Sequence, residues 1–341
     1  MLRTAVFFLC FLTSSYIGFA QDPQLSQYYN SPLYLNPAFA GTAENSRLIF
    51  NYRNQWPGVN SFTTYAASFD HDIQPYRSGV GLLIKRDQQG TSPLVSTDVS
   101  LLYSYMLEVN ENWTFRPGIQ ASFVTRNTDF YNYTFGDQLT SGGHTGSGTG
   151  ESFGNQRIFY PSFAAGGLLY NNNFWIGISA HHLNRPNQSF SDNVNQLPIK
   201  SSVHTGYRIS LDPAGFTKQS SGTEKSITPT LMYKNQGRFD QLDLGAYLTL
   251  EPVMFGLWYR GLPLKRYSAG IQNNESLILM AGLAYEGFTF AYSFDLPLSK
   301  LNVGRSAGAH EIAIIYEWSI PYNPKLLKRG RPLPCPKFYK K

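Results

Sequence analysis

A serine that could act as a nucleophile lies in a G-x-S-x-G pattern, which runs from Gly150 to Gly154. Hydrolases with this pattern place the serine on a sharp turn between a strand and a helix. Here Ser152 lies in a stretch rich in glycine, serine and threonine, residues 141–154, with no apolar strand before it. That stretch also has no G-K-[ST] sequence of the kind that binds phosphate. Its composition indicates a long loop, and we expect no catalysis by Ser152.

Two adjacent histidines, His181 and His182, fall within a predicted strand over residues 173–184. Neighbouring side chains of a strand point to opposite faces, so the two rings would not bind one ion together. A metal site would need His204 or another ligand from elsewhere, and no spacing supports one. We predict no catalytic residue, no metal and no cofactor, and therefore a protein that is not an enzyme.

Charged residues of both signs recur on the polar faces of the predicted strands. They could form a network of ion pairs that makes the interior rigid, which we favour. They could instead form charged rings that select solutes along a pathway. The residues concerned are Arg53, Asp70, Asp98, Glu108, Arg116, Arg208, Asp243, Arg260, Asp295 and Glu317.

The formal charge of +6 is concentrated in one tail. The chain has 28 basic and 22 acidic residues. Arg3 and the seven basic residues after Pro321 account for the excess, because 20 basic residues remain without them. The charge is therefore no sign of a nucleic-acid-binding face. Pro332, Pro334 and Pro336 favour an extended tail, which could bind a partner protein or anionic lipid headgroups.

The elements that must position these residues are strands of alternating polarity. Between Phe288 and Asp295 every second residue is aromatic, and the others are Thr, Ala, Ser and Asp. One face of such a strand is apolar and the other polar. About fourteen segments show the pattern: 46–56, 62–73, 77–88, 94–109, 113–127, 158–171, 173–184, 199–212, 225–236, 239–251, 253–262, 275–286, 288–296 and 309–320.

This repetition predicts an all-β fold, a transmembrane antiparallel β-barrel of about 14 strands with lipid outside and a polar interior. Aromatic residues make up 15% of the chain, as expected where tyrosine and tryptophan line both membrane interfaces. Outside the N-terminus, no run of apolar residues approaches the length that a helix needs to span a membrane. An aromatic-rich secreted β-sandwich is the alternative.

The connections between the strands alternate in length. Tight turns are predicted at 109–112, 171–173, 251–252 and 286–287, and long connections at 128–157, 185–198, 263–274 and 297–308. Bacterial barrels have short periplasmic turns and longer outer loops. Two connections break the rule. Residues 212–224 form a long connection on the predicted periplasmic side, and residues 235–238 form a short one on the predicted outer side.

The N-terminus is typical of a secretory signal, with Arg3, an apolar run from Ala5 to Leu12 and a cleavage site after Ala20. Removal of residues 1–20 would leave Cys335 as a single cysteine. Residues 21–45 contain Pro32, Pro37 and many aromatic residues, so they suit neither a central strand nor a disordered linker. We expect them either to fold into the lumen as a plug or to pack on the barrel base. The barrel would span residues 46–321 and the basic tail residues 322–341.

Six blocks of residues resemble the PorP/SprF family. They are the N-terminal blocks 22–30 and 35–41, Asn51–Pro57, Thr134–Gln138, His310–Ile312 and Pro334–Phe338. The resemblance extends through nearly the whole chain after the signal. It implies an outer-membrane protein of the type IX secretion system of Bacteroidota, which works with that machinery, and in some members with gliding motility.

The resemblance implies partners but no catalytic residues. It favours export or surface anchoring of an adhesin through its C-terminal domain, and docking to periplasmic components, which include a peptidoglycan-binding protein. Outer-membrane lipids would surround the barrel, and no nucleic acid is expected. The alternatives are a FadL-like or porin-like solute channel and an outer-membrane lipid hydrolase. The candidate partner-binding residues are Tyr28, Tyr29, Asn36, Pro37, Lys325, Lys328, Arg329, Arg331, Lys337 and Phe338.

Overall fold

A computed structural model describes residues 22–43, 46–59, 62–90, 94–130, 133–151, 156–191, 193–211, 224–268, 271–298, 303–318 and 333–334. Within them, fourteen long antiparallel strands form the barrel wall. They are β1 (Ser46–Gln55), β2 (Phe62–Ile73), β3 (Ser78–Gln89), β4 (Leu94–Tyr105), β6 (Thr114–Asn127), β9 (Arg157–Tyr170), β10 (Phe174–His181), β11 (Lys200–Tyr207), β13 (Lys225–Gln236), β14 (Phe239–Leu250), β15 (Val253–Ser268), β16 (Ile271–Tyr285), β17 (Phe288–Pro297) and β18 (Ala309–Trp318).

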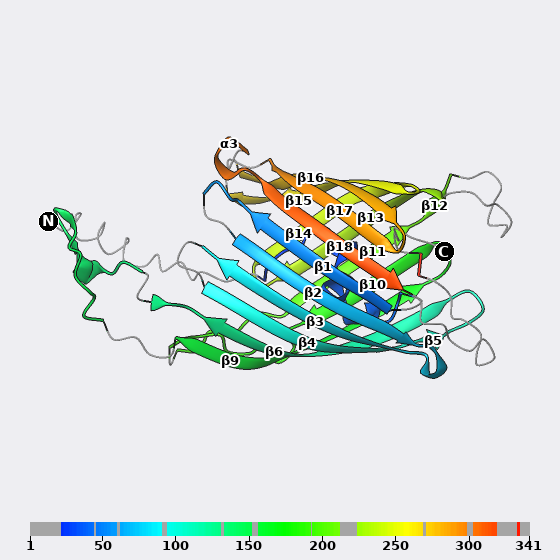
Figure 1. The fold of residues 1–341 in the computed structure, drawn as a ribbon, viewed down its shortest axis with the longest axis horizontal. Coiled ribbons are helices and arrows are strands. Elements are labelled where there is room, and N and C mark those ends of the chain that lie inside the picture. The colour runs from blue at the N-terminus through cyan, green and yellow to red at the C-terminus, as the bar shows by residue number, and fades with distance from the viewer. Residues whose placement is uncertain are drawn as a thin grey trace.

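The sheet closes on itself, because the first strand pairs with the last. Ser46 of β1 lies opposite Trp318 of β18, and Gln55 lies opposite Ala309. Every other neighbouring pair of long strands is also antiparallel. β11 pairs directly with β13, and the two-residue strand β12 (Ile209–Ser210) pairs with β13 farther along. Figure 1 shows the strands tilted around a common axis. The predicted fold class, an all-β antiparallel barrel of about fourteen strands, is confirmed.

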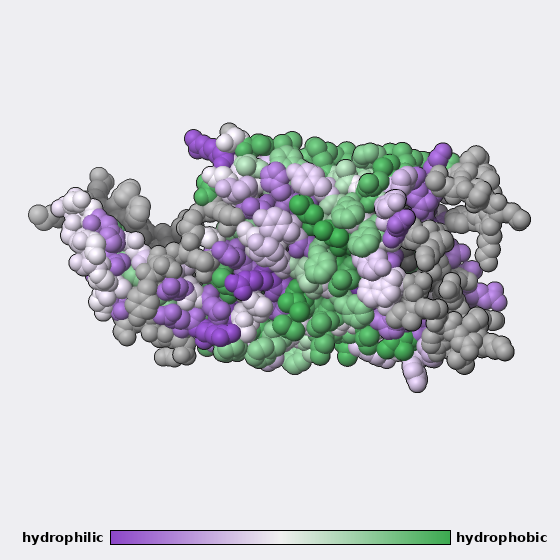
Figure 2. Space-filling view, viewed as in Figure 1, coloured by the Kyte–Doolittle hydropathy of each residue, from purple (hydrophilic) through white to green (hydrophobic). Residues whose placement is uncertain are grey.

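The two faces of the wall differ as the alternation predicts. Phe290 of β17 is 49% exposed on the outside, whereas its neighbour Thr289 is 3% exposed on the inside. The same contrast separates Ile312 from Glu311 on β18. Figure 2 shows apolar side chains gathered around the middle of the barrel and polar ones toward both ends. An apolar outer band with a polar interior is the surface that a membrane barrel needs.

Short and long connections separate to opposite ends of the barrel, except that the short turn 237–238 between β13 and β14 lies at the long-loop end. At the tight-turn end, β14 and β15 are joined through 251–252 and β16 and β17 through 286–287, and η3 (Gln74–Tyr76) joins β2 to β3. The long-loop end carries the connection between β6 and β9, which holds η5 (Gly136–Gln138) and the hairpin β7–β8 (Leu139–Thr140, Gly143–His144). It also carries α3 (Val303–Ser306). No helix in the described part of the chain is long and apolar enough to cross a membrane.

Several predicted boundaries are wrong. The connection expected at 263–274 is largely paired strand, because β15 and β16 continue past the barrel wall with Arg266 opposite Gln272. The strand expected at 94–109 breaks at Met106 before the short β5 (Leu107–Glu108), and the one at 199–212 breaks at Arg208. The strand expected at 173–184 ends at His181, because His182 has a positive φ of 59°. Residues 212–223 lie outside the described chain.

Candidate functional site: a lumen filled by the N-terminal residues

Residues 22–43, called the luminal segment below, run lengthwise inside the barrel. They contain η1 (Tyr28–Asn30), α2 (Pro32–Leu35) and η2 (Pro37–Phe39). Pro32 and Pro37 each occupy the first position of a helical turn, where the missing N–H is not needed and the fixed φ fits. The Asn36 side chain caps η2 by accepting a hydrogen bond from the Ala38 amide. Short turns of this kind compact the chain without presenting a strand edge.

At the tight-turn end the wall is shaped to receive the segment's backbone. A methyl group added at Gly79 of β3 would overlap the Ala40 carbonyl, and one added at Gly118 of β6 would overlap the Pro37–Ala38 peptide. The Ala40 carbonyl accepts a hydrogen bond of 2.7 Å from Ser104 Oγ. Gly41 donates its amide to Asp70 Oδ2 at 2.9 Å. Glycine is therefore required on two strands for the segment to lie where it does.

Four of the candidate partner-binding residues lie in the middle of the lumen. Tyr28 and Tyr29 are 3% and 5% exposed, Asn36 is fully buried, and Pro37 is buried beside it. Tyr29 Oη accepts a hydrogen bond of 2.8 Å from Trp175 Nε1. Asn36 Nδ2 donates to the Ile178 carbonyl at 2.9 Å. In this structure all four contact the barrel's own wall, so an external partner could reach them only if the segment left the lumen.

Nearer the long-loop end, five charged side chains, each from a different strand of the wall, form a buried network. Arg53 lies between Asp295 (2.8 Å) and Glu311 (3.2 Å). Arg260 lies between Asp243 (3.0 Å) and Asp295 (3.0 Å). This network, called the Arg260 network below, joins β1, β14, β15, β17 and β18, and so spans the seam where the first and last strands meet.

The luminal segment completes the Arg260 network. Two guanidinium groups face three carboxylates, so donors are needed where negative charge is in excess. Ser26 donates its amide to Glu311 Oε2 at 2.7 Å and its hydroxyl to Asp295 Oδ2 at 2.6 Å. The Gln27 amide donates to Glu311 Oε1 at 3.1 Å. Seam and segment are therefore held by the same carboxylates.

Asp22 anchors the segment at the long-loop end. Its carboxylate accepts from Lys200 Nζ at 2.7 Å and from Gln236 Nε2 at 3.2 Å, and lies 2.9 Å from His182 Nε2. Burial alone would raise the pKa of this carboxyl, but Lys200 and His182 outweigh it and hold the pKa well below its usual range. Asp22 is therefore ionised and firmly paired.

The His182 ring also bonds to Ser162, whose Oγ is 2.8 Å from Nδ1. Hydroxyl, imidazole and carboxylate are the groups that serine hydrolases combine. Ser162 is only 4% exposed and does not line the small cavity that His182 and Asp22 border. Because the hydroxyl is enclosed, we interpret the chain of bonds as one that positions Asp22.

The predicted inward charges are found on the inner face with one exception. Arg208 and Glu317 are half-buried at the tight-turn end, whereas Glu108 is exposed and pairs loosely with Arg77 at 3.7 Å. Seven of the predicted inner charges are buried: Arg53, Asp70, Asp98, Arg116, Asp243, Arg260 and Asp295. Further inner charges were not predicted, and they include Arg47, Lys85, Asp87, Arg126, Lys200, Lys234 and Glu311.

The histidine prediction needs correction. Both His181 and His182 are buried on the inside, with ring centroids 6.5 Å apart, because the strand ends between them. His204 lies elsewhere and stacks on Phe39. Among the described residues no group of His, Cys, Asp or Glu side chains could hold a metal ion. Ser152 lies outside the described chain.

The six candidate residues of the tail, Lys325, Lys328, Arg329, Arg331, Lys337 and Phe338, also lie outside the described residues. Of the tail the structure describes only Leu333 and Pro334, and both are buried. Leu333 belongs to the same buried apolar cluster as Tyr28 and Phe39.

Gly118 offers a test of how the segment is seated. We expect Gly118→Ala to lower the unfolding free energy by about 1–3 kcal/mol, because the added methyl group displaces the Pro37–Ala38 peptide. Urea titration of the purified barrel, followed by its shift on unheated gels, measures the change. Gly167→Ala is the matched control, since its methyl group would meet only the Phe115 ring, at 3.2 Å on the outside. Equal stability of the two variants would contradict the seating.

Closure, outer apolar band and polar interior together define the class: a transmembrane β-barrel of the bacterial outer membrane. A family model described as "Type IX secretion system membrane protein PorP/SprF" matches residues 17–316. The chain belongs to this family, and its place is the outer membrane within the type IX secretion system.

Solved structures with a similar course of the chain are also outer-membrane proteins. Omp33 of Acinetobacter baumannii has 8% identity and a TM-score of 0.41, and the match covers 81% of this chain and 100% of that one. A triple mutant of the Rhodopseudomonas blastica porin has 8% identity and a TM-score of 0.32, covering 80% and 99%. A comparison with curated proteins gave no match.

Proposed function

We propose that this barrel assists the export or surface anchoring of an adhesin that carries a C-terminal sorting domain, and that it docks to periplasmic parts of the secretion machine. The filled lumen supports a docking role over free diffusion, since buried side chains of the luminal segment occupy the space a solute would use. Family membership supports the link to secretion. We propose no catalytic step. A role in gliding motility belongs to the same proposal.

The orientation follows from the lengths of the connections. Short turns of bacterial barrels face the periplasm, which puts the long-loop end outside the cell. Strand β18 runs from Ala309 beside Gln55 to Trp318 beside Ser46, so the chain leaves it at the tight-turn end. The basic tail would then meet periplasmic proteins, such as a peptidoglycan-binding one. Its proposed contact residues are Lys325, Lys328, Arg329, Arg331, Lys337 and Phe338.

Affinity purification tests the docking role. Full-length protein and a variant that lacks residues 322–341 would be purified from membranes at equal abundance, and bound machine components quantified. We expect loss of the periplasmic components from the truncated protein. A variant with the five listed basic residues changed to glutamine separates charge from length. Should the same proteins accompany all three, the tail would have no docking role and lipid headgroups would be its partner.

Surface display tests the export role separately. Deletion of the gene should remove a C-terminal-domain adhesin from the cell surface and leave it in the periplasm, as measured by antibody labelling of intact cells. Complementation with the full chain should restore it. A solute channel is the alternative function, and it predicts unchanged display together with impaired uptake of a small solute.

A further inference from the structure

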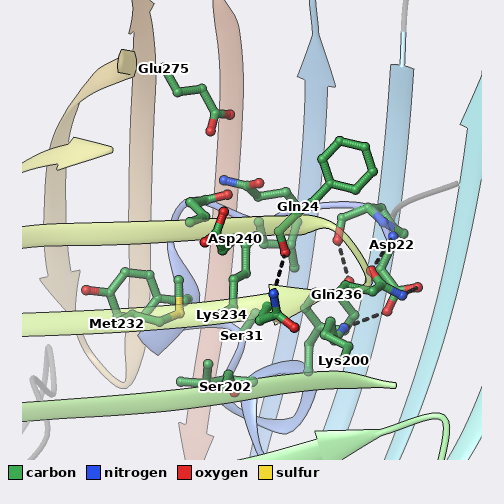
Figure 3. A pocket seen from close by; sticks show the side chains of 18 residues that line it. Asp22, Gln24, Ser31, Lys200, Ser202, Met232, Lys234, Gln236, Asp240 and Glu275 are labelled. Atoms are coloured by element: carbon green, nitrogen blue, oxygen red, sulfur yellow. Dashed lines mark hydrogen bonds and ion pairs between the residues drawn. The ribbon is translucent and has the colours of Figure 1, made fainter. Parts of the chain in front are cut away.

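A cavity of about 120 Å³ opens at the long-loop end, between the luminal segment and the wall (Figure 3). One side is formed by the segment from Asp22 to Leu35, and the other by β11, β13, β14 and β16. Since roughly 10–15 Å³ of such volume holds one water, the enclosed space would take about ten heavy atoms, and the rest of a longer ligand would extend through the opening. It borders the contacts of Asp22 with Lys200 and Gln236 that anchor the segment, and none of the five charged residues of the Arg260 network lines it.

One cation in this cavity has no carboxylate within ion-pair distance among the described residues. Lys200 is paired with Asp22 at 2.7 Å. Lys234 of β13, mostly buried, makes no hydrogen bond or ion pair with any residue that the structure describes. An ammonium taken out of water without a partner costs free energy, and an anionic group entering the cavity would recover it. The cavity therefore has an anchoring point for a carboxylate.

The rest of the lining fits peptide groups rather than a plain hydrocarbon. Gln24 Nε2 is buried and without a partner among the described residues. Amide and hydroxyl side chains from Ser31, Ser202 and Gln241 line the same space, beside the apolar surfaces of Tyr28 and Met232. The backbone amides of a bound peptide need both hydrogen-bond donors and acceptors, and its apolar side chains need apolar surfaces that exclude water.

A second unpaired charge lies across the cavity. Glu275 of β16 has no ion-pair partner among the described residues, and Figure 3 shows it set apart from Lys234. The two strands are three neighbours apart, which is about 14 Å along the wall. An extended peptide rises about 3.3 Å per residue, so one of roughly three residues reaches between them.

We propose that this cavity binds a short peptide, with its terminal carboxylate on Lys234 and its amino end toward Glu275. The binding goes beyond membership of the secretion system and does not depend on the tail or on adhesin export. Because the luminal segment forms one wall, an occupied cavity would also hold that segment in place.

Calorimetry on the detergent-purified full chain tests the proposal with the tripeptide Gly-Leu-Phe and its C-terminal amide. We expect the free acid to bind roughly tenfold or more tightly than the amide, as a charge-assisted hydrogen bond contributes. Lys234→Met should remove this preference and Lys234→Arg should keep it. Glu275→Gln should weaken binding of the free tripeptide but leave that of its N-acetyl form unchanged.

Lys225→Met is the matched control, since Lys225 lies at the opposite end of the same strand and is exposed. It should bind both peptides as the unchanged protein does, and unheated gels should show all variants folded. Equal binding of acid and amide, no binding of either, or an unchanged preference in Lys234→Met would each overturn the proposal.

Discussion

Removal of residues 22–43, with residue 21 joined directly to residue 44, is expected to turn a barrel that passes little current into an open channel. Fourteen strands enclose a lumen between those of filled eight-stranded barrels and open sixteen-stranded porins. The side chains that occupy it, such as Leu33, Phe39 and Tyr29, are 5% exposed or less and all belong to the segment. Without them the polar inner wall would face a water-filled space.

Planar-bilayer recording measures the effect. We expect the single-channel conductance to rise roughly tenfold or more, from near the baseline to a porin-like value. A synthetic peptide of residues 22–43, added to the deletion variant, should lower the current again. This addition separates an emptied lumen from a damaged barrel. A large current through the unchanged protein would contradict the docking role and favour the solute channel.

Replacement of the Arg260 guanidinium should cause the largest loss of stability for a single substitution. Its side chain is 1% exposed and lies between Asp243 and Asp295. Arg260→Met would leave the buried Asp243 carboxylate without a cation and Asp295 with Arg53 alone. Breaking a buried ion pair from one side costs about 3–5 kcal/mol. The midpoint of urea unfolding, followed by the gel shift of the unheated barrel, reports the change.

Arg77→Met is the matched control, since Arg77 and Glu108 are about half exposed and 3.7 Å apart. Exposed pairs contribute at most about 1 kcal/mol. Adding Asp243→Asn to Arg260→Met should recover part of the loss, because it removes one of the stranded charges. If Arg260→Met proves as stable as Arg77→Met, the Arg260 network does not stabilise the closed barrel.

Much of the fold is predictable because alternation is a local property. A strand between lipid and water must change polarity at every residue, so β17 and β18 can be recognised from eight or ten residues each. Where the environment changes, the prediction fails. β15 and β16 continue past Arg260, where the sequence no longer alternates between apolar and polar residues.

The site is less predictable because it depends on register and on distant contacts. Glu311 and Arg53 are directly opposite each other, but only the pairing of the first strand with the last brings them there. That pairing joins residues more than 250 positions apart in the sequence. Likewise, nothing local to His182 reveals its left-handed backbone or its bond to Asp22. The residue types alone predicted a charged interior, but the pairing register of the strands determines which charged residues form ion pairs.

The lengthwise course of the luminal segment constrains the order of assembly. Glu311 and Asp295 bind Ser26 as well as Arg53. The last strands of the barrel therefore pair with β1 around residues that are synthesised before any of these strands. The segment runs from Asp22 at one mouth to Gly41 at the other, and its Ser26 donors reach both seam carboxylates. A seam that closes with this stretch already inside gains those hydrogen bonds as it forms, so the stretch acts as a template for its own enclosure.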